Sequence, residues 1–586
     1  MKSKGYFKVL SAIGISALLL AACNSDEAGK NEGKKGESEK ADTASFPTKT
    51  AVDENAAEGG SITYGLVSDT PFEGLLNYVF YEGDPDNQVI RFFDEQLLDT
   101  DDDYVFTNEG AATYELSEDN KTITLTIKDN VNWQDGKPVT GADLEYAYLV
   151  LGSPDYKGPR YDSQMAMIEG MEEYHQGKAD TISGIKADGN KISITFKEAN
   201  PSVLTGLWTN PLHKEYLKDV AIKDLESSDK IRKNPIGFGP FKVKKIVQGE
   251  SVEFEANEDY WRGRPKLDGV TLKVVNPATV VKSLENGDVD VAEVTADLYE
   301  QADKLDNVEL IGKVDLAYSY IGFKLGHYDA KKGENVMDNP KLQDKRLRQA
   351  MAYAIDNKEV GEKMYKGLRF PANSAITPNF KYNNKELKPY EYDKEKANEL
   401  LDEAGYKDVN NDGMREDPDG KEFKLNFAAM SGDGIAEPLA KYYIQQWQDV
   451  GLDIDLMDGR LHEFNSFYDK IEKDDDKVDV FSAAWGVASD PDPSGIWARE
   501  APFNYTRWTN EKNDELLKQG ISEKAFDEDY RVDVYNQWQE LIHEEAPLIP
   551  TLFRYRLVGV NDRVKNFDFN AEREWAWYNV SVDDAK

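Results

Sequence analysis

The sequence predicts a mixed α/β protein, because strand-like and helix-like patterns of apolar residues alternate along the chain. Residues 122–128 alternate isoleucine and leucine with threonine, which is typical of a half-buried strand. A helical spacing of apolar residues follows later in the chain, and no repeat period is visible. The residues of that helical face are Leu347, Ala350, Met351, Ala354 and Ile355.

The remaining elements follow the same two patterns. Further strands are predicted at residues 192–196, after the turn signal Asp188-Gly189-Asn190, and at residues 270–274. Thr140 and Asp143 have the spacing of a capping box, so we expect a helix over residues 144–151. A late helix is predicted from Tyr535, Trp538, Leu541 and Ile542, which share one face.

The N-terminus has the pattern of an export signal. Lys2, Lys4 and Lys8 precede the mostly apolar residues 9–22, a run shorter than the roughly 20 residues that a membrane span needs. Residues 20–23, Leu-Ala-Ala-Cys, resemble the bacterial lipobox, which implies that Cys23 receives a diacylglycerol and becomes the mature N-terminus. The alternative is a buried structural cysteine beside an uncleaved leader. We therefore predict a signal peptide at 1–22 and lipidation of Cys23.

The segment after Cys23 is poor in large apolar residues. Between residues 24 and 58 only Phe46 and Val52 are aromatic or branched aliphatic, so this segment buries too little apolar surface to order itself. We expect residues 23–58 to form a disordered tether that holds a globular body on the extracytoplasmic face of the cell membrane. Cys23 is the only cysteine, so the body is stabilised without an intramolecular disulfide.

Length and charge limit the classes of partner. At roughly 150 residues per domain, the body after residue 58 predicts two or three domains. A formal net charge of −39 argues against nucleic acid and against binding to anionic lipid surfaces. We expect a monomer whose membrane contact is the lipid on Cys23.

Catalytic signatures are absent from the sequence. It contains no Gly-x-Ser-x-Gly elbow, no phosphate-binding Gly-x-x-x-x-Gly-Lys loop and no His-Glu-x-x-His, and its five histidines lack metal-ligand spacing. We therefore predict no catalytic residue, no cofactor and no metal, and a protein that is not an enzyme. An exported hydrolase stays an alternative, since a glycosidase needs only two acids roughly 5–9 Å apart.

One loop has part of a calcium-binding pattern. Asp408, Asn410, Asp412 and Gly413 match the opening of such a loop, but its twelfth position is Asp419 instead of glutamate. A turn built by Asx residues and glycine explains the same residues. Whether this loop binds calcium is left open by the sequence.

Six longer blocks resemble the peptide-binding class of extracellular solute-binding proteins of ABC importers, the oligopeptide- and dipeptide-binding lipoprotein family. They occur in the order of that family across nearly all of the mature body. The blocks are Asn-Trp-Gln-Asp-Gly-Lys-Pro-Val-Thr-Gly-Ala-Asp at 132–143, Asn-Pro-Ile-Gly-Phe-Gly-Pro-Phe at 234–241, Asn-Glu-Asp-Tyr-Trp at 257–261, Arg-Leu-Arg-Gln-Ala-Met-Ala-Tyr-Ala-Ile-Asp at 346–356, Leu-Leu-Asp-Glu-Ala-Gly-Tyr at 400–406 and Glu-Ala-Pro-Leu-Ile-Pro at 545–550.

The resemblance implies an α/β, two-lobed, periplasmic-binding-protein-like clamshell with a third subdomain inserted in the first lobe. By analogy the segments are 59–87 for the first lobe, 88–210 for the inserted subdomain, 211–315 for the first lobe again, 316–552 for the second lobe and 553–586 for the return to the first lobe.

The resemblance also implies a function. Such a protein captures extracellular oligopeptides in the cleft between its lobes and delivers them to the permease and ATPase subunits of an importer. The peptide lies extended, its backbone pairs with protein main chain, and its α-amino group meets a carboxylate. A receptor for one signalling peptide, such as a pheromone, is the alternative that the sequence does not separate from a nutrient scavenger.

The family places that carboxylate shortly after a tryptophan in the second lobe. The matching residues are Trp485, as a wall of the cleft, and Asp490, with Asp492 as the alternate. The spacing departs from enteric members, because two Asp-Pro steps occur and the first aspartate comes five residues after Trp485. A turn whose carboxylates cap backbone amides is the alternative interpretation.

Three further residues are candidates for the cleft. Tyr161 matches a family tyrosine that lines the cleft from the inserted subdomain, although packing against the core would explain it equally. Trp497 and Arg499 follow the aspartates closely enough to be considered.

Overall fold

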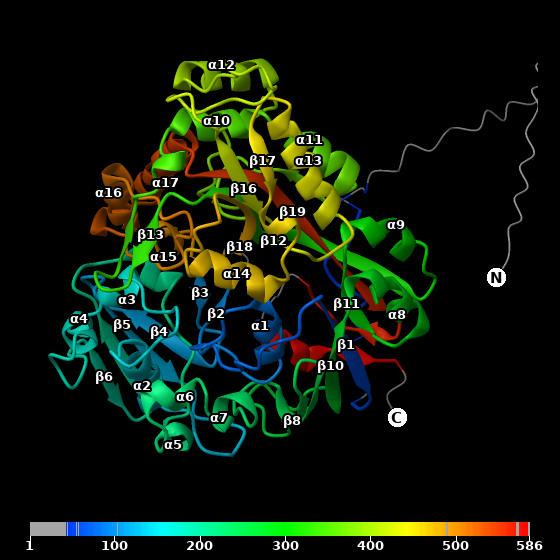
Figure 1. The fold of residues 1–586 in the computed structure, drawn as a ribbon. Coiled ribbons are helices and arrows are strands. Elements are labelled where there is room, and N and C mark those ends of the chain that lie inside the picture. The colour runs from blue at the N-terminus through cyan, green and yellow to red at the C-terminus, as the bar shows by residue number, and fades with distance from the viewer. Residues whose placement is uncertain are drawn as a thin grey trace, which may run out of the picture. The chain divides into compact units, whose positions relative to one another are not determined.

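Two long strands, β12 (Val308–Phe323) and β19 (Leu548–Asn561), organise the fold and pair antiparallel to each other along most of their length. Figure 1 shows them running between the part of the molecule that holds β16 and β17 and the part that holds β1 and β10. The computed structural model describes residues 41, 43, 45–53, 56, 58–101, 104–487, 490–569 and 574–583. The signal peptide and Cys23 lie outside the described residues.

The largest sheet contains both long strands. Among the described residues it has 11 strands, in the order β17-β16-β18-β12-β19-β11-β1-β10-β9-β8, with β15 paired to β19. The bounds of the other members are β1 (Ser61–Val67), β8 (Phe241–Val247), β9 (Ser251–Ala256), β10 (Gly269–Val275), β11 (Val291–Val294), β15 (Arg369–Pro371), β16 (Lys424–Ala428), β17 (Asp453–Leu456) and β18 (Val480–Gly486).

Smaller sheets complete the strands. One sheet has the order β4-β5-β7-β6 and lies in the segment that the sequence assigns to the inserted subdomain. Its members are β4 (Ala112–Leu116), β5 (Thr122–Ile127), β6 (Ile185–Asp188) and β7 (Lys191–Thr195). The two-stranded pairs are β2 (Asp99–Thr100) with β3 (Phe106–Thr107), β13 (His327–Asp329) with β14 (Glu334–Val336), and β20 (Val564–Lys565) with β21 (Ser581–Val582).

Apart from α2 (Gly141–Leu151), the helices in the first half of the chain are short, and the other long helices lie in the second half. They are α1 (Asp84–Ile90), α2 (Gly141–Leu151), α3 (Ser163–Ala166), α4 (Met171–His175), α5 (Lys214–Leu217), α6 (Ile222–Leu225), α7 (Asp229–Arg232), α8 (Val280–Asn286), α9 (Tyr299–Ala302), α10 (Lys345–Tyr353), α11 (Asn357–Glu359), α12 (Lys394–Ala404), α13 (Ala436–Gln448), α14 (Phe464–Glu472), α15 (Ser494–Trp497), α16 (Glu511–Gly520) and α17 (Glu528–Glu545). Short 3-10 or π turns are η1 (Pro201–Leu204), η2 (Pro277–Thr279), η3 (Ala296–Leu298), η4 (Pro340–Leu342), η5 (Val360–Met364), η6 (Met457–Gly459), η7 (Glu523–Phe526) and η8 (Glu574–Asn579). No helix in the described part of the chain is both long and apolar enough to cross a membrane.

The local predictions are confirmed where they can be compared. The alternating segments form β5, β7 and β10, and the two helical faces belong to α10 and α17. Thr140 and Asp143 form the capping box of α2, in which the Thr140 amide donates to Asp143 Oδ2 at 2.8 Å. The sequence therefore determines these elements through local patterns.

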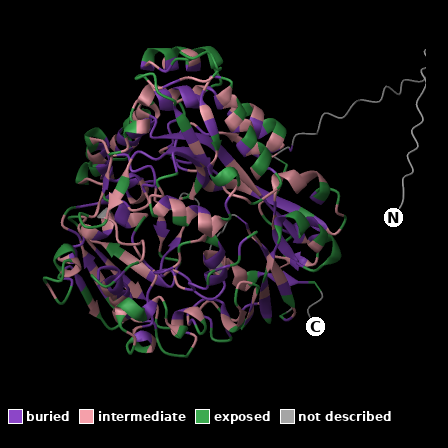
Figure 2. Ribbon diagram, in the orientation of Figure 1, coloured by how far each residue is buried: buried purple, intermediate pink, exposed green. Residues whose placement is uncertain are grey.

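The buried residues form separate cores. One core extends from Tyr318 to Phe553, a second from Leu75 to Phe238, and two more join the N-terminal strands to the C-terminal segment. Figure 2 shows buried residues concentrated along the strands, while helices such as α12 carry exposed faces. The second core includes residues on both sides of the expected insertion at 88–210, whose boundaries remain a prediction.

The pairing of β12 with β19 is interrupted near its middle. Val314 pairs with Tyr555, but the next pair is Tyr318 with Phe553, so three residues of β12 oppose one of β19. This bulge bends and twists the ladder locally. It coincides with the place where the sequence puts the crossings between the lobes, near residues 316 and 552.

The segment expected to be a tether is partly ordered. The Thr50 amide donates to the Phe567 carbonyl at 2.9 Å, Lys49 pairs with Asp568 at 2.7 Å, and the ring of Phe46 lies 6.0 Å from that of Tyr555. The prediction of a disordered tether is therefore wrong for residues 45–53. The composition of this stretch does not reveal its order, because one aromatic ring and backbone pairing with the C-terminal segment are enough to hold it in place.

Candidate functional site

A large cavity lies beside the bulge in the long strands. Its volume is about 1580 Å³, larger than the roughly 300–1,000 Å³ of sites for small molecules. Its wall includes residues around α1, the loops near α3 and η1, the middle of β12 and β19, and the loops after β18. Arg554 Nε donates to Asp315 Oδ2 at 2.7 Å where the two long strands face the cavity.

Asp490 and Asp492 both line this cavity, as the sequence predicts. Their carboxylates already have protein partners. Gln164 Nε2 donates to Asp490 Oδ2 at 3.3 Å and to Asp492 Oδ2 at 2.6 Å, and Arg531 Nη2 lies 3.4 Å from Asp490 Oδ1. Ser494 Oγ donates to Asp492 Oδ1 at 2.8 Å. The turn interpretation is therefore partly right, because Asp492 also accepts the Ser494 amide at 3.2 Å.

The charges of this group are unbalanced. Burial, and secondly the charge of Asp490, raise the pKa of Asp492 to about 7. Burial also raises the pKa of Asp162, which lines the cavity nearby and feels the charge of Asp490. Arg531 is the cation that contacts Asp490, and its side chain is 4% exposed. When Asp492 is ionised, the two carboxylates of Asp490 and Asp492 face the single guanidinium of Arg531, and a cationic group of a ligand would neutralise the extra negative charge.

Trp485 lies at the end of β18 and lines the cavity, as predicted. Its ring stacks on Tyr505, with centroids 5.2 Å apart and planes at 24°, and meets the edge of Phe503 at 5.2 Å. These three rings form one aromatic wall of the cavity. Apolar surface of this kind favours side chains of a ligand over water.

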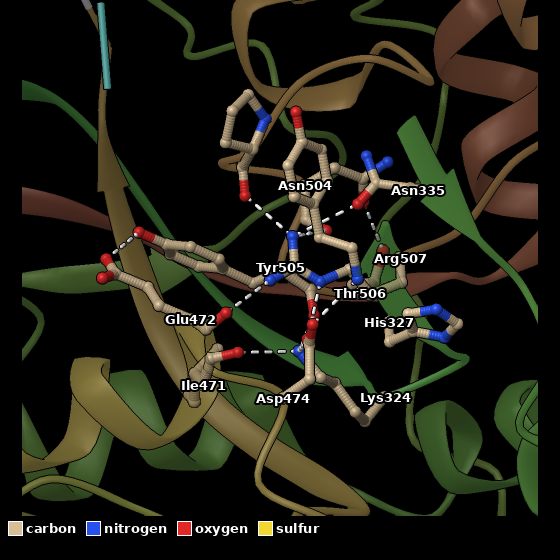
Figure 3. A network of polar contacts seen from close by, with 12 residues as sticks. Lys324, His327, Asn335, Ile471, Glu472, Asp474, Asn504, Tyr505, Thr506 and Arg507 are labelled. Carbon is tan, nitrogen blue, oxygen red and sulfur yellow. Dashed lines mark hydrogen bonds and ion pairs between the residues drawn. The ribbon is translucent and has the colours of Figure 1, made fainter. Parts of the chain in front are cut away.

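A buried polar network stands behind the aromatic wall. Lys324 Nζ donates to the carbonyls of Ile471 at 2.7 Å and Tyr505 at 3.1 Å and pairs with Asp474, as Figure 3 shows. Arg507 Nε donates to Asp474 Oδ1 at 2.7 Å. Burial and the charge of Arg507 lower the pKa of Lys324 to about 7, while Asp474 opposes that shift.

This network reaches the cavity through Glu472. Tyr505 Oη donates to Glu472 Oε1 at 2.7 Å, and both residues line the cavity. Burial raises the pKa of Glu472, although the bond from Tyr505 works against the shift. The backbone of Tyr505 and its hydroxyl are thus both held, which fixes the orientation of the wall.

The other predicted residues are placed differently. Trp497 lines the cavity, but its side chain is 1% exposed and its Nε1 donates to Tyr318 Oη at 3.2 Å, so it belongs mainly to the core. Arg499 is not among the lining residues and pairs with Asp514 at 2.8 Å. Tyr161 is also not among them: its ring stacks on His175 at 3.8 Å. The side chains of Tyr161 and Arg499 thus have their partners outside the cavity wall, and a role for either residue in peptide binding stays a prediction.

Sequence reasoning missed Gln164 and Arg531. Gln164 lies just after the segment that drew attention to Tyr161, yet a lone glutamine carries no chemical signal. Arg531 belongs to α17, whose apolar face predicted only a core helix. Neither residue has a local pattern that links it to residues 490–492.

The calcium-like loop uses its acidic groups internally. Asn410 Nδ2 donates to Asp412 Oδ2 at 3.0 Å and to Glu416 Oε1 at 2.6 Å, and the Gly413 amide donates to Asp408 Oδ2 at 3.0 Å. The Asp412 amide also donates to Asn410 Oδ1 at 2.8 Å and the Met414 amide to Asp412 Oδ1 at 2.8 Å, which are the bonds of two Asx turns. Within the described residues no group of three or more His, Cys, Asp or Glu side chains could hold a metal ion.

Comparison with known proteins gives consistent matches. The family model for bacterial extracellular solute-binding proteins, family 5 (middle), matches residues 106–506. The oligopeptide-binding protein OppA of Lactococcus lactis subsp. cremoris (strain SK11) is 34% identical over 598 residues, which cover 98% of each chain.

Solved structures agree with this match. Lactococcal OppA, complexed with an endogenous peptide in the closed conformation, superposes with a TM-score of 0.85 at 34% identity, covering 90% of this chain and 100% of that one. AppA from Bacillus subtilis in complex with a nonapeptide gives 0.77 at 25% identity, with coverage of 90% and 100%.

Proposed function

Because this chain belongs to the bacterial extracellular solute-binding proteins of family 5, we propose that it captures oligopeptides in the cavity between its two lobes. It then delivers the peptide to the permease of an ABC importer and performs no bond chemistry of its own. The observation that carries the proposal is the cavity of about 1580 Å³, whose wall combines residues from both lobes and the inserted subdomain. Two relatives of the same fold hold peptides in their solved structures.

The α-amino group of the peptide is assigned to the aspartates of the second lobe. Asp490 and Asp492 together carry two carboxylates against the single guanidinium of Arg531. An ammonium buried beside them would gain charge-assisted hydrogen bonds and neutralise the surplus charge. We therefore assign the ammonium to the pair as a unit, with Trp485 as the neighbouring apolar wall.

A comparison of blocked and free peptides tests this assignment. The wild-type body would be titrated calorimetrically with a nonapeptide and with the same nonapeptide acetylated at its N-terminus. We expect the acetylated peptide to bind at least about tenfold more weakly, since it lacks the charged hydrogen-bond donor. Asp490→Asn and Asp492→Asn should each reduce the affinity for the free peptide. Each should also reduce the difference in affinity between the free and the acetylated peptide. Equal affinity for both peptides would remove the aspartates from this role.

The same samples distinguish binding from catalysis and from signalling. Mass spectrometry after prolonged incubation should recover the intact peptide, and any cleavage product would contradict the proposal. A pool of unrelated peptides should be retained broadly. Retention of a single sequence would instead indicate a receptor for one signalling peptide.

We also propose that a lipid on Cys23 holds the protein at the outer face of the cell membrane. The lipobox-like residues 20–23 support this assignment, and two or more acyl chains give stable anchoring. The wild-type protein should fractionate with membranes, whereas Cys23→Ser should not. Equal membrane association of both proteins would contradict the anchor.

A further inference from the structure

We propose that Gln164 is a positioning residue that ties the inserted subdomain to the second lobe in the closed arrangement, with Gly206 providing the room for this tie. The contacts between the inserted subdomain and the second lobe do not depend on the ligand. The claim that these contacts strengthen peptide binding rests on the proposed function. The residues involved come from two distant parts of the chain: Gln164, Ser202 and Gly206 on one side, and Asp490, Asp492 and Arg531 on the other.

The first tie is the side-chain amide of Gln164. A primary amide has two N–H donors, and those of Gln164 reach Asp490 Oδ2 at 3.3 Å and Asp492 Oδ2 at 2.6 Å. The backbone that carries Gln164 is itself held, because Asp162 caps α3 by accepting the Met165 amide at 2.8 Å. One neutral side chain therefore positions both carboxylates without adding charge.

The second tie is made by Arg531. Its Nη2 donates to Ser202 Oγ at 2.9 Å while the same nitrogen lies 3.4 Å from Asp490 Oδ1. Ser202 and Arg531 are both buried. The guanidinium thus bridges η1 of the inserted subdomain and the aspartate of the second lobe in a buried setting, where hydrogen bonds to a charge contribute most.

Gly206 lies where the two sides approach each other. A Cβ atom at this position would lie 2.5 Å from Asp490 Oδ2, 3.1 Å from Asp490 Cβ and 3.1 Å from Gln164 Oε1. Asp490 is held by Gln164 and Arg531, so it has little freedom to retreat. Because the φ angle of Gly206 is outside the left-handed region, alanine fits the backbone. The obstacle to alanine is therefore the approach of the second lobe.

Other contacts between the lobes have acceptor residues that are exposed to solvent. Ser431 Oγ donates to Asp69 Oδ2 at 2.8 Å, and Thr70 Oγ1 donates to Glu463 Oε2 at 3.3 Å. Such bonds are weakened by competition with water. The tie from Gln164 and Arg531 to Asp490, whose side chain is 7% exposed, is therefore the one expected to decide how readily the lobes close.

The experiment compares three variants of the full-length protein with the wild type. Gln164→Ala removes the amide and Gly206→Ala blocks the approach. Gln519→Ala is the matched control, since Gln519 donates to Glu515 Oε1 at 2.9 Å in an exposed setting and is not among the residues that line the cavity. Cys23 is the only cysteine, so in a Cys23→Ser background spin labels can be attached at introduced cysteines, such as Glu173→Cys and Glu511→Cys. Their distance distribution reports closure with and without a tryptic peptide pool.

We expect a peptide-dependent short distance in the wild-type protein and in Gln519→Ala. In Gln164→Ala and Gly206→Ala the short distance should be depleted, and the affinity for peptide should fall about tenfold, as for the loss of a hydrogen bond to a charged group. Unchanged melting temperatures would show that folding is intact. The same short-distance population in all four proteins would overturn the inference.

A conservative variant adds a readout that a purely structural role would not produce. Gln164→Glu places a third carboxylate against the aspartates at pH 8 but regains a donor when it is protonated near pH 5. The short distance should therefore return in Gln164→Glu on acidification. A wild-type protein that retains no peptide would contradict the proposed function. A short-distance population that is the same in the wild type and in the variants of residue 164 at both pH values would contradict only the tie.

Discussion

Arg531 lies 3.4 Å from Asp490, and the two side chains are 4% and 7% exposed. Seen along the chain, they are 41 residues apart, and the pair stands at the edge of the cavity that we assign to the ligand. An ion pair in this setting is expensive to break, because the remaining charge stays buried.

Arg531→Met should therefore destabilise the protein by about 3 kcal/mol, since Asp490 would keep its burial and lose its counter-charge. Urea unfolding at pH 7 measures this change. Arg499→Met is the matched control: its pair with Asp514 is about one-third exposed, and its removal should cost less than about 1 kcal/mol. Equal losses for the two variants would refute the assignment of Arg531 as the buried counter-charge.

Peptide affinity should depend on pH through Asp492. Burial and the charge of Asp490 raise the pKa of this carboxyl to about 7, and a bound ammonium would lower it. Binding below pH 7 must then release a proton, so affinity should rise from pH 5.5 to pH 7 and level off, by at most about tenfold per pH unit. Calorimetry in buffers of different ionisation enthalpy measures both the affinity and the number of protons released on binding. Asp492→Asn should flatten the profile, and a wild-type affinity that is constant over this range would argue against Asp492.

Stability without ligand should follow the opposite trend. The pKa of Asp492 is raised in the folded protein from 3.8, so the folded state holds its proton more tightly than the unfolded state does. The contribution of Asp492 to the free energy of unfolding should accordingly fall as the pH rises from about 4 to about 7. The free energies of unfolding of the wild type and of Asp492→Asn, measured with urea at pH 5 and pH 7.5, isolate this contribution. If the difference between the two proteins were the same at both pH values, the raised pKa of Asp492 would be contradicted.

Lys324→Met should destabilise the fold and loosen the aromatic wall. Lys324 Nζ donates to the carbonyls of Ile471 and Tyr505 and pairs with Asp474, so its loss leaves two buried carbonyls and the Asp474 carboxylate without this donor. We expect a loss of about 2–3 kcal/mol in urea unfolding. Lys345→Met is the control and should change stability little, because Lys345 and its partner Glu544 are 37% and 68% exposed.

Replacing Trp485 should affect peptide binding, whereas replacing Tyr161 should affect the stability of the fold. Trp485 lines the cavity and stacks on Tyr505, so Trp485→Ala should weaken peptide affinity by about tenfold or more through lost apolar contact. Tyr161 stacks on His175, so Tyr161→Ala should lower the melting temperature and leave affinity unchanged. Titration of both variants with one nonapeptide is the measurement. A loss of affinity confined to Tyr161→Ala would restore the role that the sequence gave this tyrosine.

The elements and the family followed from local information. The alternating residues of β5 and the capping box of α2 are set by neighbours within a few positions, and the six family blocks are contiguous stretches. For the same reason the tether was misjudged: composition alone does not reveal that Thr50 and Lys49 pair with residues near 567, more than 500 positions away.

The sequence by itself determined the fold class, the family and the position of Asp490 and Asp492 at the cavity, because these depend on patterns that are written along one stretch of chain. Only the tertiary structure decided which partners those carboxylates meet, and that Tyr161 and Arg499 turn to other partners. The physical reason is that Gln164, Arg531 and Gly206 reach the aspartates through packing of separate elements, and packing leaves no periodic signal in the residues that take part.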